Sequence, residues 1–131
     1  MTGFGLAGHL HEMLEASGCA AVIDFARVPM FAGTWEAAKA YCRPARAFDI
    51  MDEAEAYVSQ TLVSGERLAD EEYDNRLAVL CDPQTSGGIL AAIPPDRVQD
   101  FERSFEEHAG HRAWRIGEIA KGAAGTISFV R

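Results

Sequence analysis

From residue 77 onward, short apolar runs alternate with one amphipathic segment. Residues 77–81 and 88–93 are short and apolar, which predicts two strands separated by the sequence DPQTSGG. Prolines 94 and 95 open a predicted helix that runs to His108, with Val98, Phe101 and Phe105 on one face and Gly110 after its end. Two more strands are predicted in AWRIGEIA and TISFV. This order predicts an α+β fold with helices packed on a mixed β-sheet.

The first two thirds of the chain contain further predicted elements. Helical spacing of apolar residues predicts a helix over residues 5–17 that ends at Gly18, and residues 19–25 predict a strand. Thr34 is a candidate N-cap for a helix that runs to residue 41. The side chains of Trp35 and Ala38 would face the core, and that of Cys42 is a further candidate to do so. Pro44 would end this helix, residues 52–62 predict another, and residues 65–75 are expected to be irregular or one short turn. We find no repeat or linker, so residues 1–131 are expected to form a single domain.

Composition and charge exclude several classes of protein. The 131 residues are 48% hydrophobic, which suits one packed core, but no apolar run is long enough to predict a membrane span. The first residues lack the basic start of a secretory signal. The net charge is −8, and residues 49–74 contain nine acidic residues and only one basic residue. This acidic composition disfavours nucleic acid as a partner and indicates a solvated surface. Three widely spaced cysteines indicate reduced thiols and a cytoplasmic protein.

The segment TGFGLAGH places glycines just before the first predicted helix. Backbone N–H groups at a helix start are free to bind an anion, and Gly3 and Gly5 would let a phosphate approach. The same glycines also suit a tight entry into the helix with no ligand, and the pattern alone favours this structural interpretation.

His9, His11 and Glu12 raise the possibility of a metal site. Residues two apart on a helix point to different sides, the spacing does not match His-Glu-x-x-His, and no third ligand is evident. We therefore predict histidines that cap or border the core, and no metal site.

The DPQTSGG segment combines turn-forming and hydrogen-bonding residues. Asp82 could accept backbone N–H bonds beside Pro83, Thr85 and Ser86 offer hydroxyls, and Gly87 and Gly88 permit close approach of a ligand. These properties suit an anion-facing loop and a self-bonded structural loop equally. The chain has no P-loop and no Gly-x-Ser-x-Gly elbow, and a cysteine that ends an apolar run, such as Cys81, is usually packed.

The two glycine segments together resemble signatures of a known enzyme family. TGFGLAGHLHEM at the start and LCDPQTSGGIL at residues 80–90 are similar to stretches in the C-terminal domain of selenophosphate synthetase (selenide, water dikinase). That domain belongs to the aminoimidazole ribonucleotide synthetase-like superfamily. The closing RIGEI and GTISFV also resemble the end of this domain, whereas residues 41–76 depart from the family pattern.

The resemblance implies an activity for a complete enzyme. The family makes selenophosphate, AMP and phosphate from ATP, selenide and water, with Mg²⁺. The resemblance also implies that the family's reactive cysteine or selenocysteine, its lysine and most of its nucleotide contacts lie in an N-terminal domain. That domain is not among these residues. The family's Asp-x-Thr-Gly-Phe-Gly would place a magnesium-binding Asp two positions before Thr2.

The resemblance also sets expectations for individual residues. Thr2, Gly3 and Gly5 would be phosphate-adjacent, and no catalytic residue or metal ligand is assigned in this chain. The signature loop, made of Asp82, Gln84, Thr85, Ser86, Gly87 and Gly88, is expected to shape the fold and the face toward the N-terminal domain rather than to carry chemistry. We expect no ATP or Mg²⁺ bound tightly to these residues alone.

Two alternatives to a selenophosphate synthetase domain remain open. One is the equivalent domain of another ATP-dependent synthetase or kinase of the superfamily, and the other is a free-standing, non-catalytic binding module. The expected partners are the N-terminal domain and, through the apolar face that its removal would expose, a second copy of the chain.

Overall fold

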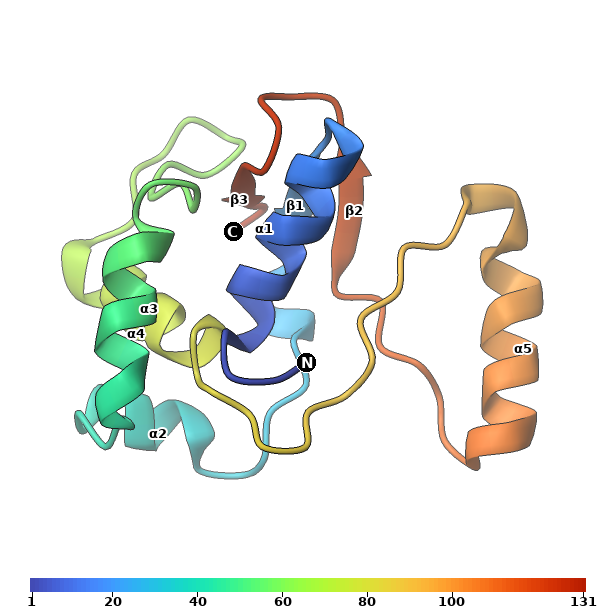
Figure 1. Cartoon of the computed structure of the whole chain (residues 1–131), viewed down its shortest axis with the longest axis horizontal. Helices are drawn as coiled ribbons and strands as arrows, with labels where there is room; N and C mark the ends of the chain where they lie inside the picture. The colour runs from blue at the N-terminus through green and yellow to red at the C-terminus, as the bar shows by residue number, and fades with distance from the viewer.

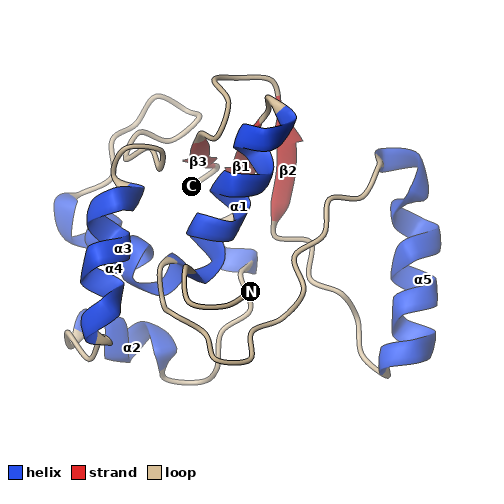
Figure 2. Cartoon of the chain, viewed as in Figure 1, coloured by secondary structure: helices blue, strands red, loops and turns tan.

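The computed structural model describes all residues, 1–131. Its elements, in chain order, are α1 (Gly5–Ser17), β1 (Ala20–Ile23), the 3₁₀ helix η1 (Phe25–Arg27), α2 (Thr34–Lys39), α3 (Ala45–Ala54), α4 (Asp70–Leu80), the 3₁₀ helix η2 (Pro95–Arg97), α5 (Val98–Ala109), β2 (Gly117–Ala120) and β3 (Ile127–Phe129). Figure 1 shows them along the chain, and Figure 2 separates helices from strands by colour. None of the helices has the length and apolar character needed to cross a membrane.

A three-stranded mixed sheet lies at the centre of the fold. The strand order is β2-β1-β3, with β1 antiparallel to β2 and parallel to β3. The register places Ala21 beside Ile119 on one side and Ile127 on the other. In Figure 1, α1 lies in front of β1, while α3 and α4 lie to its left. The predicted α+β class, helices packed on a mixed sheet, is confirmed.

The core lies between this sheet and helices α1, α3 and α4. Leu14 of α1, Ile50 of α3 and Leu77 of α4 are buried and belong to one cluster with Phe129 of β3. Arg76 is also buried, and its guanidinium carbon lies 5.2 Å from the centre of the Phe129 ring. Its Nη1 donates to the Arg131 carbonyl at 2.6 Å, so the buried charge has a hydrogen-bond partner.

The first helix and the last helix confirm the sequence predictions. Helix α1 has the predicted bounds, and Gly18 ends it with a φ of 65°. This left-handed conformation suits glycine because it has no Cβ. Helix α5 follows η2 and ends at Gly110, which has a φ of 75°. The predicted strands at 19–25, in AWRIGEIA and in TISFV are present in shorter form as β1, β2 and β3.

The helix predicted over residues 52–62 is wrong. Helix α3 begins directly after Pro44 and ends at Ala54. Beyond it the backbone pairs with β3, because Ile127 N–H donates to the Tyr57 carbonyl and Ser59 N–H donates to the Ile127 carbonyl, each at 2.8 Å. These non-local bonds outweigh the local helical spacing of the side chains.

The strand predicted over residues 77–81 and the irregular segment 65–75 are also wrong. Helix α4 spans Asp70–Leu80. Asp70, Glu71 and Glu72 lie in its first turn, where negative charge favours the helix. Most of its second half is buried, and a short apolar run of this kind does not distinguish a buried strand from a buried helix.

Smaller corrections concern α2 and residues 88–93. Gly33, rather than Thr34, is the N-cap of α2, which stops at Lys39, well before Pro44, and Cys42 is exposed. Pro44 instead precedes α3. Residues 88–93 form no strand in the structure, since they have no partner in the sheet.

Candidate functional site

The first residues of the chain lie beside the DPQTSGG loop. Gln84 N–H donates to the Thr2 carbonyl at 3.1 Å, and Gly87 N–H donates to the Met1 carbonyl at 3.2 Å. Met1 N donates in turn to the Gly88 carbonyl at 2.7 Å. The fold therefore joins the two glycine segments, 77 or more positions apart in the sequence, into one surface, which we call the glycine site (residues 1–5 and 82–88).

Gly5 packs tightly against the end of α4. A Cβ at this position would lie 2.5 Å from the Leu80 carbonyl oxygen and 2.8 Å from the Cys81 Cα, and its φ is +65°. Gly3, by contrast, has open space where a Cβ would stand. Gly5 is therefore needed for packing, while Gly3 leaves the surface open.

The start of α1 offers free backbone donors beside this open surface. The N–H groups of Leu6 and Ala7 have no acceptor within the chain, and the first turn contains no acidic residue. Such donors carry the positive end of the helix dipole. This end of the glycine site therefore has donors that suit an anion, which is the alternative that the pattern of Gly3 and Gly5 left open.

His9 fixes the position of Thr2. Its Nε2 lies 3.0 Å from both the Thr2 backbone nitrogen and Thr2 Oγ1, and the backbone N–H donates to it. An Nε2 that accepts this bond is unprotonated, so the neutral ring carries its proton on Nδ1, which lies 3.4 Å from Glu12 Oε2. His9 is therefore a positioning residue for the glycine site, a role that the sequence analysis did not assign.

His11 has its own partners, on another part of the fold from those of His9. The His11 ring stacks on Tyr57 with ring centres 3.8 Å apart, and its Nδ1 lies 2.9 Å from the Gly125 carbonyl oxygen. No group of three or more His, Cys, Asp or Glu residues in the chain could hold a metal ion. The two histidines thus have separate partners.

The polar residues of the loop differ in their partners. The Asp82 carboxylate accepts a bond from the Gln84 side-chain amide, rather than the backbone bonds of the proposed Asx-turn. Burial raises the pKa of Asp82, and the bond from Gln84 acts in the opposite direction. Thr85 and Ser86 are exposed, and their hydroxyls have no partner within the chain. Asp82 and Gln84 therefore shape the loop, and the two hydroxyls remain available to a ligand.

Comparison with known proteins decides the family. Residues 1–129 match the family described as AIR synthase related protein, C-terminal domain. The chain belongs to this family. The resemblance drawn from the two glycine segments is therefore confirmed, and the AIR synthase related domain covers nearly every residue described above.

Several curated relatives of this AIR synthase related domain share one name. The chain is 35% identical to a "Selenide, water dikinase" of Colwellia psychrerythraea, with 99% of the chain and 34% of the relative covered. It is 39% identical to that of Bordetella bronchiseptica over 91% of the chain and 31% of the relative. It is 37% identical to the "Selenide, water dikinase" of Pseudomonas aeruginosa, with 92% of the chain and 32% of the relative covered. The chain thus spans about a third of the length of these relatives.

Cys81 lies directly behind the glycine site and is fully buried. Burial raises the pKa of its thiol to about 12, so the thiolate is scarce at neutral pH. This favours the packed cysteine over a nucleophile.

We predict that alkylation at pH 8 labels Cys42 and Cys19 in the folded chain, while Cys81 reacts only after unfolding. Because the folded state holds the Cys81 proton more tightly than the unfolded state, stability should fall as the pH rises from about 9 toward 12. Mass spectrometry of the labelled chain and urea unfolding at several pH values measure both effects. Rapid labelling of Cys81 in the folded chain would contradict this assignment.

Proposed function

We propose that this domain is the C-terminal part of a selenide, water dikinase, which makes selenophosphate, AMP and phosphate from ATP, selenide and water. The observation that carries the proposal is that selenide, water dikinases match over at least nine tenths of the chain at 35–39% identity. The glycine site supports it, because both family segments meet there. We also propose a cytoplasmic location, which the three free cysteines support.

The residues of the glycine site fit phosphate groups. In this proposal Thr2, Gly3 and the free N–H groups at the start of α1 line one wall for the ATP phosphates. Thr85 and Ser86 offer their hydroxyls from the neighbouring loop. The wall contributes hydrogen bonds and the positive helix end, and it orients the phosphates without supplying a nucleophile.

The same residues do not fit a complete magnesium site. Mg²⁺ prefers octahedral oxygen ligands with carboxylates among them, and the glycine site contains one carboxylate, Asp82, which already binds Gln84. Burial raises the pKa of Asp82, which disfavours the charged form that a metal needs. We therefore assign no metal ligand here and propose that the upstream part of the longer protein holds Mg²⁺ and most of the nucleotide.

His9 gives the proposal a specific test in the longer protein. His9→Ala removes the acceptor that holds Thr2, and we expect the KM for ATP to rise about fivefold while the fold persists, since a hydrogen bond contributes about 1 kcal/mol. His9→Gln, which retains a side-chain acceptor, serves as the matched control and should recover part of the loss. Equal KM values for the wild type and His9→Ala would contradict the positioning role.

Exposed apolar side chains suggest where the rest of the protein binds. Phe4 is 44% exposed beside Gly3 and Gly5, and Phe31 is 91% exposed. We propose that such side chains contact the upstream domain, and that the isolated domain self-associates through them. Light scattering at increasing concentration should show a rising mass, which Phe4→Ser should reduce. A monomeric mass at all concentrations would contradict this proposal.

A further inference from the structure

Thr2, His9 and Glu12 form a connected row at the start of α1. Thr2 Oγ1 lies 3.0 Å from His9 Nε2, and His9 Nδ1 lies 3.4 Å from Glu12 Oε2. A hydroxyl, an imidazole and a carboxylate are thus joined in that order. In other enzymes this arrangement takes a proton from the hydroxyl group, while the carboxylate holds the imidazole in place. We call these three residues the α1 relay.

The packing around His9 fixes the orientation of its ring. The backbone N–H of Thr2 donates to Nε2, so the lone pair of this nitrogen is directed toward Thr2. The Phe4 ring meets the imidazole edge-to-face, with ring centres 6.0 Å apart. A Cβ at Gly8 would lie 2.7 Å from Phe4 Cβ, so glycine leaves the room that Phe4 occupies beside His9.

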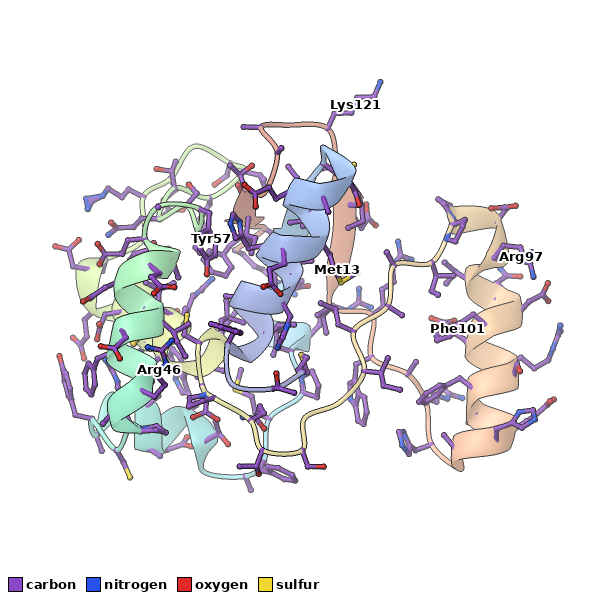
Figure 3. The ribbon with its side chains drawn as sticks, viewed as in Figure 1. Met13, Arg46, Tyr57, Arg97, Phe101 and Lys121 are labelled. Atoms are coloured by element: carbon purple, nitrogen blue, oxygen red, sulfur yellow. The ribbon has the colours of Figure 1, made fainter.

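The other histidine of α1 lies apart from the relay. His11 stacks on Tyr57, and Figure 3 shows Tyr57 and Met13 on opposite sides of α1. His9 precedes Met13 by four residues, which places these two on the same side of the helix. His11 therefore provides a control histidine from the same helix, on the side away from the relay.

The α1 relay is open to a ligand. Thr2 and Glu12 are exposed, and His9 is partly exposed. Thr2 Oγ1 has no partner in the chain other than His9, and it belongs to the glycine site. The relay therefore ends on the surface at which the ATP phosphates are proposed to bind.

The proposed reaction contains one step that needs a proton acceptor. ATP loses two phosphoryl groups, one to selenide and one to water, because the products are selenophosphate, AMP and phosphate. Hydrogen selenide is a much stronger acid than water, so it reacts as an anion. Water, by contrast, must lose a proton as its oxygen bonds to phosphorus. A base beside the phosphates would therefore serve the water step.

We propose that Thr2 positions this water and that His9 accepts the proton. The water oxygen bonds to phosphorus, and the P–O bond to the leaving group breaks, with its electron pair remaining on the leaving oxygen. The water passes a proton to Thr2 Oγ1 as the Thr2 hydroxyl proton moves to His9 Nε2, from which a proton later returns to solvent.

Each member of the relay then has a distinct role. Thr2 contacts the reacting water and is the catalytic residue, while His9 and Glu12 act through it. The Glu12 carboxylate stabilises the imidazolium and keeps the Nδ1 proton on its own side of the ring. The inference rests on the proposed function and names the step of that reaction which this chain serves.

His9→Gln in the longer protein separates proton uptake from positioning. Glutamine offers an acceptor to the Thr2 N–H but takes up no proton. We expect the KM for ATP to lie closer to that of the wild type than to that of His9→Ala. The kcat for AMP formation should nevertheless fall about a hundredfold. His11→Gln is the matched control and should keep the wild-type kcat. A wild-type kcat in His9→Gln, or an equal fall in both variants, would overturn the inference.

Variants of Thr2 test the same step without a change at His9. Thr2→Val removes the hydroxyl and keeps the backbone N–H bond, so kcat should fall about as far as in His9→Gln. Thr2→Ser keeps the hydroxyl and should stay near the wild type. Because the residues act as a unit, the double variant should be no slower than either single variant. Losses that multiply in the double variant, or a wild-type kcat in Thr2→Val, would contradict the relay even if His9→Gln failed to fold.

The wild-type longer protein distinguishes this inference from the proposed function. If it forms no AMP in the presence of selenide, the proposed function and the relay fail together. If it forms AMP only with selenide and the Thr2 and His9 variants keep its kcat, the proposed function stands and the relay alone is wrong.

Discussion

Replacing Phe129 by alanine is expected to lower the free energy of unfolding by about 4 kcal/mol, the range for large aromatic side chains in a core. Phe129 is 0% exposed and lies in β3, beneath the helices. Its ring meets the Phe25 ring edge-to-face at 6.2 Å and lies under the buried Arg76 guanidinium. The change therefore leaves a cavity and also removes an aromatic partner of a buried charge. Urea unfolding followed by circular dichroism measures the loss.

Phe31→Ala is the matched control for Phe129→Ala. The Phe31 side chain is 91% exposed, so its removal should change the free energy of unfolding by less than about 0.5 kcal/mol. If both variants lost similar stability, the core would not be centred on β3.

Replacing Gly5 by alanine is expected to cost about 3 kcal/mol, from the positive φ and the overlap with α4 together. The new Cβ would lie 2.5 Å from the Leu80 carbonyl oxygen, which is a backbone atom, and the Cβ has no side-chain torsion that could move it away. The start of α1 would have to move from the end of α4, which carries the DPQTSGG loop. In the longer protein we expect loss of activity as well as stability.

Gly3→Ala separates the packing role from the binding role. No atom lies within 4 Å of a Cβ built on Gly3, so thermal unfolding should be nearly unchanged. The added methyl group faces the proposed phosphate wall and should weaken ATP binding in the longer protein. Equal destabilisation by Gly3→Ala and Gly5→Ala would contradict the tight contact assigned to Gly5.

Local patterns in the sequence were sufficient to predict α1 and α5. Helix α1 combines apolar residues at helical spacing with a glycine directly after its end, and α5 combines prolines, an apolar stripe and Gly110. In both cases the signals that start and stop a helix lie within a few residues of each other. The bounds of α1 could therefore be predicted without any tertiary contact.

Non-local contacts explain the errors. Tyr57 and Val58 are spaced like helical residues, but their backbone pairs with Ile127 about 70 positions later. Leu77 and Leu80 belong to a buried helix, in which nearly every side of the second half is covered and no polar alternation remains. The sequence alone does not show which distant segments pair, and this pairing decides such cases.

The candidate site was predictable in its residues and not in its geometry. The glycine segments were recognisable by their residue types, yet their contact depends on the packing of the end of α4 against the start of α1. The bond from Thr2 N–H to His9 needs a turn of backbone before the helix, and spacing on the helix alone gives no sign of it. His9 would have been found by asking which side chains of the first two turns can reach back over the helix start.

The proposed function is tested most directly by calorimetric titration with ATP and Mg²⁺, first of this chain and then of the chain combined with the upstream part of the protein. AMP formation is followed in the same samples. We predict no saturable binding to the chain alone, and AMP formation that requires selenide once the upstream part is present. Tight saturable binding by the chain alone, or AMP formation indifferent to selenide, would contradict the proposal.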